Sequence, residues 1–277
     1  VPLTEIIPKG FMAVRKGKRN MSWRADKPAT LAYVEALDGG DPANKVEFRD
    51  EIFLWNAPFD AAATSLVKTP QRYDRIIWGN DNVAIISDEW YDTRNTKTYV
   101  INPSNPSQGP KVIFDRNAQD AYSDPGNFET RKNQYNRYVL AIENDNAYLI
   151  GNGFTKNGQF PFISEFNLKT LQTNRLYTST YKDKKEDLLE IEDFKKGTVL
   201  VQIQSKNEYP NYYLRNFKQK NKLTPITAFK NPFESIKNVN KEVIKYKRKD
   251  GVELSGTLYL PVGYDNVKKE KMPLKIQ

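Results

Sequence analysis

The chain has 277 residues, 43 basic and 34 acidic side chains and a formal charge of +9, and it contains neither cysteine nor histidine. These absences exclude, from these residues alone, a Ser-His-Asp triad, a Cys-His dyad, a disulfide and a zinc site of the usual ligand types. The chain contains no run of 18 apolar residues, which is about the length that a membrane-spanning helix needs. Acidic residues interrupt almost every basic cluster, whereas a nucleic-acid footprint would need the positive charges on one face, and this argues against a nucleic-acid partner. No Ca²⁺-loop spacing is present either, and we expect no metal and no cofactor.

Composition favours sheets in one large or two smaller domains. Apolar residues make up 38% of the chain, yet aromatic residues reach 12%, and aromatic side chains suit the pleated surface of a sheet. The amino terminus has no initiator Met and no apolar signal region. We therefore expect the chain to be part of a longer or processed protein, with no targeting segment of its own. For that parent protein a secreted or periplasmic location is favoured.

Short runs rich in β-branched and aromatic residues follow one another along the chain at intervals of roughly 8–16 residues, which is typical of a sandwich, barrel or propeller. The runs are Leu31–Leu37, Ile52–Trp55, Arg75–Trp78, Val83–Ser87, Thr98–Ile101, Val112–Phe114, Tyr138–Ile142, Ala147–Ile150, Phe160–Phe166, Asn174–Tyr177, Thr198–Gln204, Tyr212–Asn216 and Leu223–Ile226. One stretch, Tyr181–Phe194, is a candidate helix, although the apolar positions at its end also fit a strand.

A weak internal repeat favours the propeller among these all-β folds. Residues 76–86 can be laid over residues 140–150, and both read strand, Asn-Asp-Asn turn, strand. A degenerate third copy surrounds Lys195-Lys196-Gly197, and Asn, Asp and Gly supply the positive φ angles that tight hairpins require. Two more strands follow each hairpin, and four strands per unit is typical of a propeller blade. A chance similarity between ordinary hairpins is the alternative, but the recurring rhythm predicts about four blades, the first within residues 11–68.

The last part of the chain has a different character. Val243–Lys247 and Leu254–Pro261 flank Arg248-Lys249-Asp250-Gly251, and Asp-Gly between two alternating runs is a strong hairpin signal. A polar linker precedes this hairpin. We therefore expect a partial propeller over residues 1–235 and, over residues 236–277, a linker and the first hairpin of a second domain too short to bury its own core.

Three motifs resemble a known family. The segment Tyr246–Pro261 is similar to the junction of the prolyl oligopeptidase family of serine peptidases, in which such a hairpin opens the α/β-hydrolase catalytic domain. Ser22–Leu31, continuing to Glu35–Pro42, resembles the glutamyl-endopeptidase-like branch of that family, and so does Ser87–Arg94. The resemblance covers nearly the whole chain and implies a partial β-propeller that leads into a hydrolase domain.

The family's catalytic apparatus is missing from these residues. It consists of a Gly-x-Ser-x-Gly nucleophile elbow followed by an acid and a histidine, and the chain has neither that elbow nor any histidine. The resemblance therefore implies a part that is inactive alone, whose propeller gates a missing active site and helps to bind peptide substrates. The alternative is a stand-alone propeller that binds a protein or a glycan.

Five side chains are candidate contacts to a peptide substrate. A glutamyl preference needs cations near the carboxylate pocket, and Arg binds carboxylates through paired hydrogen bonds. Glu89 could instead hold a peptide amino terminus. For each residue an ordinary surface charge is the competing interpretation. The candidates are Arg24, Lys27, Glu89, Arg94 and Arg131.

Two further expectations concern packing. Four tryptophans are expected to pack between blades: Trp23, Trp55, Trp78 and Trp90. A propeller that is cut through leaves open strand edges, which tend to pair with another chain. We therefore expect an open arc of about four blades, or self-association through strand edges, but not a closed monomeric ring.

Overall fold

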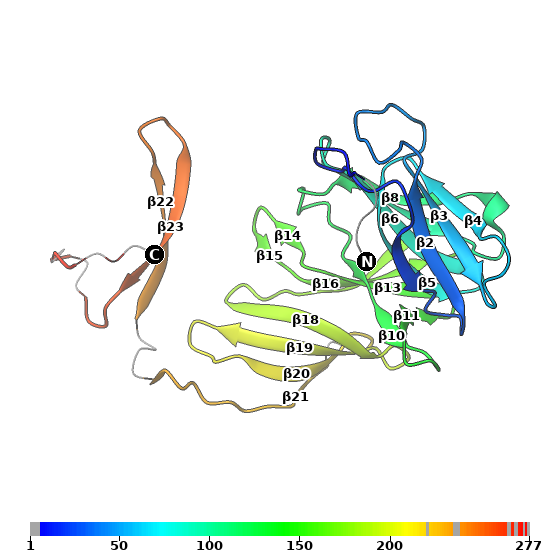
Figure 1. The fold of residues 1–277 in the computed structure, drawn as a ribbon. Coiled ribbons are helices and arrows are strands. Elements are labelled where there is room, and N and C mark those ends of the chain that lie inside the picture. The colour runs from blue at the N-terminus through cyan, green and yellow to red at the C-terminus, as the bar shows by residue number, and fades with distance from the viewer. Residues whose placement is uncertain are drawn as a thin grey trace.

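The computed structural model describes residues 6–219, 222–234, 239–264, 267–268, 271–273 and 275. Within these ranges the chain is built from β-strands, together with one short 3₁₀ helix, η1 (Pro106–Gln108). The prediction of an all-β chain is confirmed. The strands form successive antiparallel sheets that fan out along the chain, followed by a separate hairpin (Figure 1).

The first two sheets each contain four strands that pair in chain order, as propeller blades do. Blade 1 consists of β1 (Arg19–Trp23), β2 (Thr30–Ala36), β3 (Asp50–Asn56) and β4 (Thr64–Thr69). Blade 2 consists of β5 (Arg72–Asn80), β6 (Val83–Trp90), β7 (Asn95–Ile101) and β8 (Lys111–Asn117).

Blade 3 has a first strand made of two short pieces, with a hairpin inserted between them. The pieces β9 (Asn127–Phe128) and β12 (Ile142–Glu143) both pair with β13 (Asn146–Gly151). The inserted hairpin is β10 (Thr130–Lys132) and β11 (Tyr138–Leu140). The blade continues with β16 (Phe162–Asn167) and β17 (Thr173–Thr178), after a small side hairpin of β14 (Phe154–Thr155) and β15 (Gly158–Gln159). Blade 4 consists of β18 (Lys184–Asp193), β19 (Thr198–Ser205), β20 (Asn211–Asn216) and β21 (Lys222–Pro225).

The hydrophobic core lies between the faces of neighbouring blades. Ala32, Val34 and Ile52 of blade 1 pack against Trp78 and Ile86 of blade 2 in one buried cluster. Two similar clusters join blade 2 to blade 3 and blade 3 to blade 4. Because successive side chains of a strand point to opposite faces, the middle strands of blades 2 and 3 can supply apolar groups to both neighbours.

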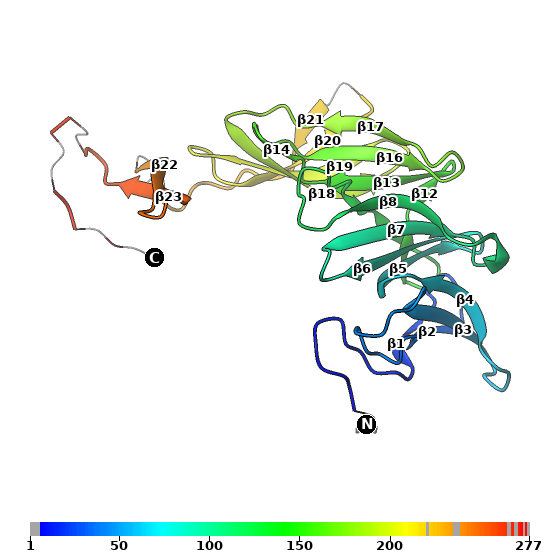
Figure 2. The same cartoon turned by 90° about the horizontal axis from the view of Figure 1, so that it is seen from above.

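The four blades form an open arc. Blade 1 and blade 4 lie at opposite ends of the fan in both views (Figures 1 and 2), and no described strand of blade 4 pairs with one of blade 1. The first strands of neighbouring blades come close together: a Cβ on Gly79 of β5 would lie 3.1 Å from Ile142 of β12. These first strands therefore mark the inner side of the arc.

The two ends of the blades are distinct. One end carries the connections between first and second strands, residues 24–29, 81–82, 144–145 and 194–197; we call it the first-turn end. The opposite end carries residues 37–49, 91–94, 152–161 and 206–210, and we call it the second-turn end. Strand β21 runs antiparallel to β20 and so leaves blade 4 at the second-turn end, from which the chain continues to the terminal hairpin.

The terminal hairpin consists of β22 (Asn240–Lys247) and β23 (Glu253–Leu260), which pair over their whole length. Its turn places Gly251 at φ +85°, as the Asp-Gly signal predicts. The hairpin lies apart from the four blades in both views (Figures 1 and 2). The predicted domain boundary near residue 236 lies outside the described residues.

Three local predictions differ from the structure. The candidate helix Tyr181–Phe194 is wrong, because residues 184–193 form β18 and pair with the apolar strand β19. Tyr138–Ile142 is divided between β11 and β12. The two Asn-Asp-Asn turns are not equivalent: Asn144 and Asp145 have φ of 50° and 62°, whereas the first hairpin turns at Asp81-Asn82 after a register shift near Asn80, with no positive φ at either residue.

Among the described residues, no helix is long and apolar enough to cross a membrane.

Candidate functional site

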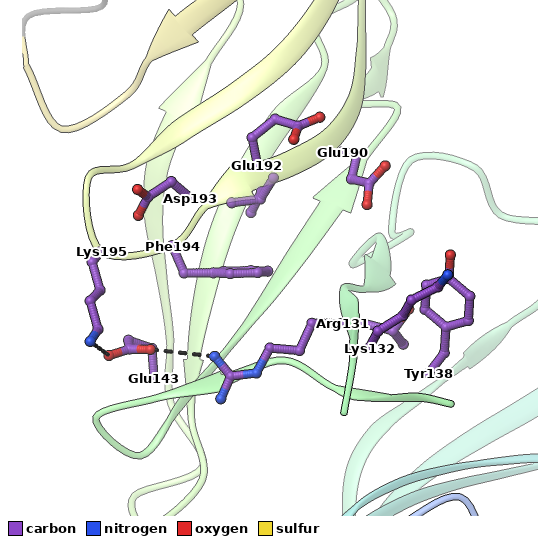
Figure 3. A pocket seen from close by; sticks show the side chains of 11 residues that line it. Arg131, Lys132, Tyr138, Glu143, Glu190, Glu192, Asp193, Phe194 and Lys195 are labelled. Carbon is purple, nitrogen blue, oxygen red and sulfur yellow. Dashed lines mark ion pairs between the residues drawn. The ribbon is translucent and has the colours of Figure 1, made fainter. Parts of the chain in front are cut away.

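A recess of about 550 Å³ lies on the inner side of the arc, between blades 3 and 4 (Figure 3). Its walls come from β10, from the end of β12 and from the last residues of β18 with the turn that follows them. Arg131 lies 3.5 Å and Lys195 4.0 Å from carboxylate oxygens of Glu143. Glu190 and Glu192 face the recess without a cationic partner in the described part of the chain. Both signs of charge therefore line this recess.

A second recess of about 420 Å³ lies on the other side of the β10–β11 hairpin. Lys27 and the Asn80-Asp81 turn form one wall, and residues 131–134 form the other. Arg131 and Lys132 line both recesses, because β10 separates them. Both recesses lie towards the first-turn end of the blades.

The inserted β10–β11 hairpin is held by contacts that reach from blade 3 to blade 1. The Asn133 side chain donates to the carbonyl of Ala25 at 2.9 Å, and Arg137 donates to the carbonyl of Lys27 at 2.9 Å. Val139 and Leu140 at the base of the hairpin are buried. The hairpin is thus fixed at both its tip and its base.

Two of the candidate cations are already paired with carboxylates of the chain. Arg24 is buried and makes two 2.8 Å hydrogen bonds to Asp26 while its guanidinium lies 4.9 Å from the Trp78 ring centroid. Lys27 forms an ion pair with Asp81, and this hydrogen bond lowers the pKa of the Asp81 carboxyl. The guanidinium of Arg24 therefore stabilises the turn between β1 and β2 and has little capacity for a ligand.

Glu89 and Arg94 lie at the opposite end of blade 2. Glu89 is exposed on β6 opposite Thr96. Arg94 adopts φ 55° in the β6–β7 turn, and its guanidinium stacks 3.5 Å from the Tyr91 ring centroid. The structure therefore brings Lys27 and Arg131 together at the first-turn end and places Glu89 and Arg94 at the second-turn end.

The tryptophans divide between buried and exposed positions. Trp78 is buried between blades 1 and 2, as expected, and Trp90 lies 3.8 Å from the Arg49 guanidinium of a blade 1 loop. Trp55 and Trp23, by contrast, contact Phe59 on the face of blade 1 that points away from blade 2. The expectation of packing between blades is wrong for these two within the described arc, because the alternation of β1 and β3 turns them outward.

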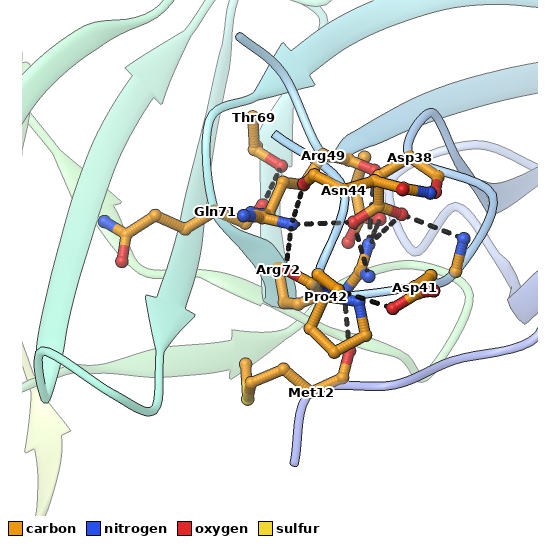
Figure 4. Close-up of polar contacts among 12 residues, drawn as sticks. Met12, Asp38, Asp41, Pro42, Asn44, Arg49, Thr69, Gln71 and Arg72 are labelled. Carbon is orange, nitrogen blue, oxygen red and sulfur yellow. Dashed lines mark hydrogen bonds and ion pairs between the residues drawn. The ribbon is translucent and has the colours of Figure 1, made fainter. Parts of the chain in front are cut away.

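A buried ionic network at the second-turn end was not anticipated from the sequence (Figure 4). Arg72 donates to both oxygens of Asp38 at 3.0 and 2.7 Å, to Asp50 at 3.0 Å and to the carbonyl of Met12 at 2.8 Å. Arg49 adds a 2.9 Å bond to Asp38, and Arg19 pairs with Asp50. The only sequence signal was the segment Glu35–Pro42, which the family resemblance singled out without assigning it a role. The network ties the N-terminal segment to blades 1 and 2.

Two carboxyls have raised pKa values. Burial raises the pKa of Asp88 in β6 to about 6, although Tyr99 and the backbone of Gln71 donate hydrogen bonds to it. Burial raises the pKa of Glu129, at the seam between blades 3 and 4, to about 7, and the nearby charge of Glu190 adds to this shift. In the described residues no group of three or more acidic side chains gathers in a way that could hold a metal ion.

Comparisons with known proteins decide what this arc resembles. No family model matches the chain. It is 37% identical over 291 residues to a probable chloroplastic glutamyl endopeptidase of Oryza sativa subsp. japonica, and the match covers 99% of this chain and 31% of that protein. The chain is thus similar to proteins named glutamyl endopeptidases over nearly its whole length. A second probable chloroplastic glutamyl endopeptidase, from Arabidopsis thaliana, is also 37% identical, with 99% of this chain and 30% of that protein covered.

The glutamyl endopeptidase relatives are about three times as long as this chain. The chain therefore spans about a third of the curated relatives that it matches. Among solved structures, oligopeptidase B from Trypanosoma brucei matches 88% of this chain and 32% of its own, with a TM-score of 0.50 at 12% sequence identity. This likeness concerns the fold. The predicted resemblance to glutamyl endopeptidases is confirmed over 99% of the chain.

Proposed function

We propose that this chain is the non-catalytic propeller part of a serine-type peptidase, which admits and helps to bind peptide substrates for a hydrolase domain elsewhere in a longer protein. The observation that carries the proposal is the match of 99% of the chain to proteins named glutamyl endopeptidases, of which it spans about a third. A part that covers so little of its relatives would contribute one region of the whole enzyme.

The order of the elements supports this proposal. Four blades are followed by the β22–β23 hairpin, and that hairpin carries the segment Tyr246–Pro261 that resembles the entrance to an α/β-hydrolase domain. The chain reaches this hairpin from the second-turn end. We accordingly propose a propeller over residues 1–235 and a hydrolase-opening segment over residues 236–277.

The chemistry of the chain limits it to binding and positioning. A serine peptidase of this type needs a nucleophile elbow and a histidine base, and the chain has no histidine. Its contribution to peptide hydrolysis would therefore come from charged and polar groups that face the substrate. Of the five candidates, Glu89 and Arg94 lie at the end from which the chain leads to the hydrolase-opening hairpin, and we propose them as the ones nearest the reaction.

The test uses the longer protein that contains this chain. We expect roughly the next 250 residues, the size of one domain, to include Gly-x-Ser-x-Gly. We also expect the longer protein to cleave a labelled peptide and to lose that activity with a serine-directed phosphonate, while the 277-residue chain alone neither cleaves nor reacts. The absence of the motif, or hydrolysis that the phosphonate does not touch, would contradict the proposal and favour a stand-alone binding module.

A further inference from the structure

We infer that the β10–β11 hairpin is a binding surface for an acidic peptide segment, at a place separate from the reaction itself. This inference rests on the proposed function, because it names the class of peptide that the propeller would hold. It assigns the role to residues 130–140 and to the recess beside them.

Charge on this hairpin is unbalanced. Residues 130–140 include Arg131, Lys132 and Arg137 and no acidic residue. Lys132 has no ion pair with a carboxylate in the described part of the chain, and its ammonium lies 5.6 Å from the Tyr138 ring centroid. Arg137 donates to backbone carbonyls only. A solvated cation that lacks a carboxylate partner is free to attract one from a ligand.

The acidic residues near these cations lie mainly on the other side of β10, where Glu143, Glu190 and Glu192 line the first recess. The second recess has only two aspartates in its wall, and both are already paired. Asp26 forms an ion pair with Arg24, and Asp81 forms one with Lys27. Arg131 donates a 2.8 Å hydrogen bond to the carbonyl of Ile142 and lies 3.5 Å from Glu143, and 47% of its side chain remains exposed. A carboxylate that enters the recess would therefore meet Arg131 and Lys132 and could form charge-assisted hydrogen bonds with both.

The shape of the site favours an extended peptide. The recess has a volume of about 420 Å³, and residues 131–134 provide donors along one wall. Tyr135 and Tyr138 are exposed on the same hairpin and offer apolar surface for the spacer residues of a peptide. The bonds of Asn133 and Arg137 to blade 1 hold the hairpin in place before any ligand arrives, which reduces the ordering cost of binding.

The site lies at the first-turn end, whereas the chain leads to the terminal hairpin from the second-turn end. A peptide held here would be bound through residues distant from the bond to be cleaved. The expected effect is therefore on the affinity for long acidic peptides rather than on the chemical step.

The inference can be tested on the 277-residue chain by fluorescence anisotropy with a labelled twelve-residue peptide of alternating Glu and Ser and a counterpart in which Gln replaces Glu. We expect the Glu peptide to bind about tenfold more tightly than the Gln peptide at low salt, and this difference to shrink at about 0.3 M NaCl. The R131Q/K132Q variant should bind the Glu peptide about fivefold more weakly or worse. K132Q alone should weaken binding by about twofold, which is half of that effect on a logarithmic scale. The K182Q/K206Q variant removes the same charge from the second-turn end and should bind like the unchanged chain.

Three outcomes would overturn the inference. The first is equal affinity for the two peptides, and the second is an R131Q/K132Q variant that binds like K182Q/K206Q. The third concerns a single-stranded oligonucleotide of similar charge. If it binds more tightly than the Glu peptide, and R131Q/K132Q abolishes that binding, the hairpin is a general surface for polyanions. Because no hydrolysis is measured, a negative result here leaves the peptidase proposal standing, and a failure of that proposal would not change these affinities.

Discussion

Arg72 shows how a single side chain holds the start of the arc together. It is buried, and it neutralises two buried carboxylates, Asp38 and Asp50, while it also binds the carbonyl of Met12. A guanidinium suits this position because its planar fork can serve several acceptors at once. Forming a buried ionic network adds little net stability, because the charges must leave water. Removal of one partner, however, is strongly destabilising, because it leaves a buried charge uncompensated.

Replacement of Arg72 by Met should therefore be costly. We expect R72M to lower the free energy of unfolding by about 3–5 kcal/mol, because Asp38 and Asp50 lose a partner inside the protein. Urea unfolding at pH 7 measures this. The matched control is R75M on the same strand, whose ion pair with Asp74 at 3.7 Å is exposed and should contribute under about 1 kcal/mol. Equal losses in the two variants would show that the network does not stabilise the fold.

Asp88 is a buried carboxyl of a different kind, because no cation of the described residues lies within ion-pair distance of it and one of its oxygens has no hydrogen-bond partner there. Burial raises its pKa in the folded chain to about 6, above the ordinary value of 3.8 for an Asp side chain. The folded state therefore binds a proton more tightly than the unfolded state, and Asp88 lowers stability as pH rises from about 4 to about 6 and keeps it low above that range.

Substitution of Asp88 by Asn should remove this pH-dependent penalty. We expect D88N to be more stable than the unchanged chain by about 1–3 kcal/mol at pH 8, and this difference to fall to about a third of its value at pH 4.5. Urea unfolding across this pH range is the measurement. D115N alters an exposed carboxyl whose pKa is lowered, mainly by its hydrogen bond with Asn95, and should not gain stability as pH rises. A D88N benefit that is constant with pH would contradict the proposed cause.

At the scale of elements, the β2–β3 connection explains why two adjacent glycines occur in the segment Glu35–Pro42. Both have positive φ, +72° at Gly39 and +79° at Gly40. A Cβ at Gly39 would find nothing closer than 4.0 Å, whereas one at Gly40 would lie 2.0 Å from the carbonyl oxygen of Val14. Gly40 also accepts a hydrogen bond from the Val14 N–H at 3.0 Å, so the N-terminal segment packs directly on this glycine.

The two glycines should therefore respond differently to the same substitution. We expect G39A to cost about 1 kcal/mol, the usual penalty of a left-handed backbone, and G40A about 3 kcal/mol or more because the segment at Val14 must move. Thermal or urea unfolding distinguishes them. Limited proteolysis should also cleave the segment before β1 sooner in G40A. Equal costs would show that the close approach at Gly40 is unimportant.

At the scale of the whole molecule, the open arc exposes the outward face of an end blade as well as strand edges. The outward face of blade 1 carries an aromatic group formed by Trp23, Trp55 and Phe59, and Trp23 is 49% exposed. An exposed aromatic face of this kind favours association with another surface. Self-association of this chain, expected from its open ends, would therefore use this face.

We predict that the chain self-associates at concentrations near 100 µM and that W23E shifts it towards the monomer, because a charge on the aromatic face disfavours burial. Sedimentation velocity over a concentration series is the measurement. Y122E is the control, since Tyr122 is similarly exposed but lies on the loop between blades 2 and 3. A chain that stays monomeric throughout, or a Y122E effect as large as that of W23E, would contradict this prediction.

The sequence by itself determined the all-β class, the four-strand rhythm, the terminal hairpin and the family resemblance. These depend on local patterns, namely the alternation of apolar residues and turn residues such as Asp250-Gly251, and such patterns act over a few neighbours. The absence of histidine likewise needed no structure to exclude a triad from this chain.

Only the tertiary structure decided how distant residues combine. Asp38 and Arg72 lie 34 positions apart, and Asn133 and Ala25 lie 108 apart, so neither contact has a local signal in the sequence. For the same reason the five candidate residues could not be grouped from their spacing, and the structure separates Lys27 and Arg131 from Glu89 and Arg94 by the length of a blade. Tyr181–Phe194 became a strand because β19 offered it a partner, and pairing between strands overrides a weak local preference for helix.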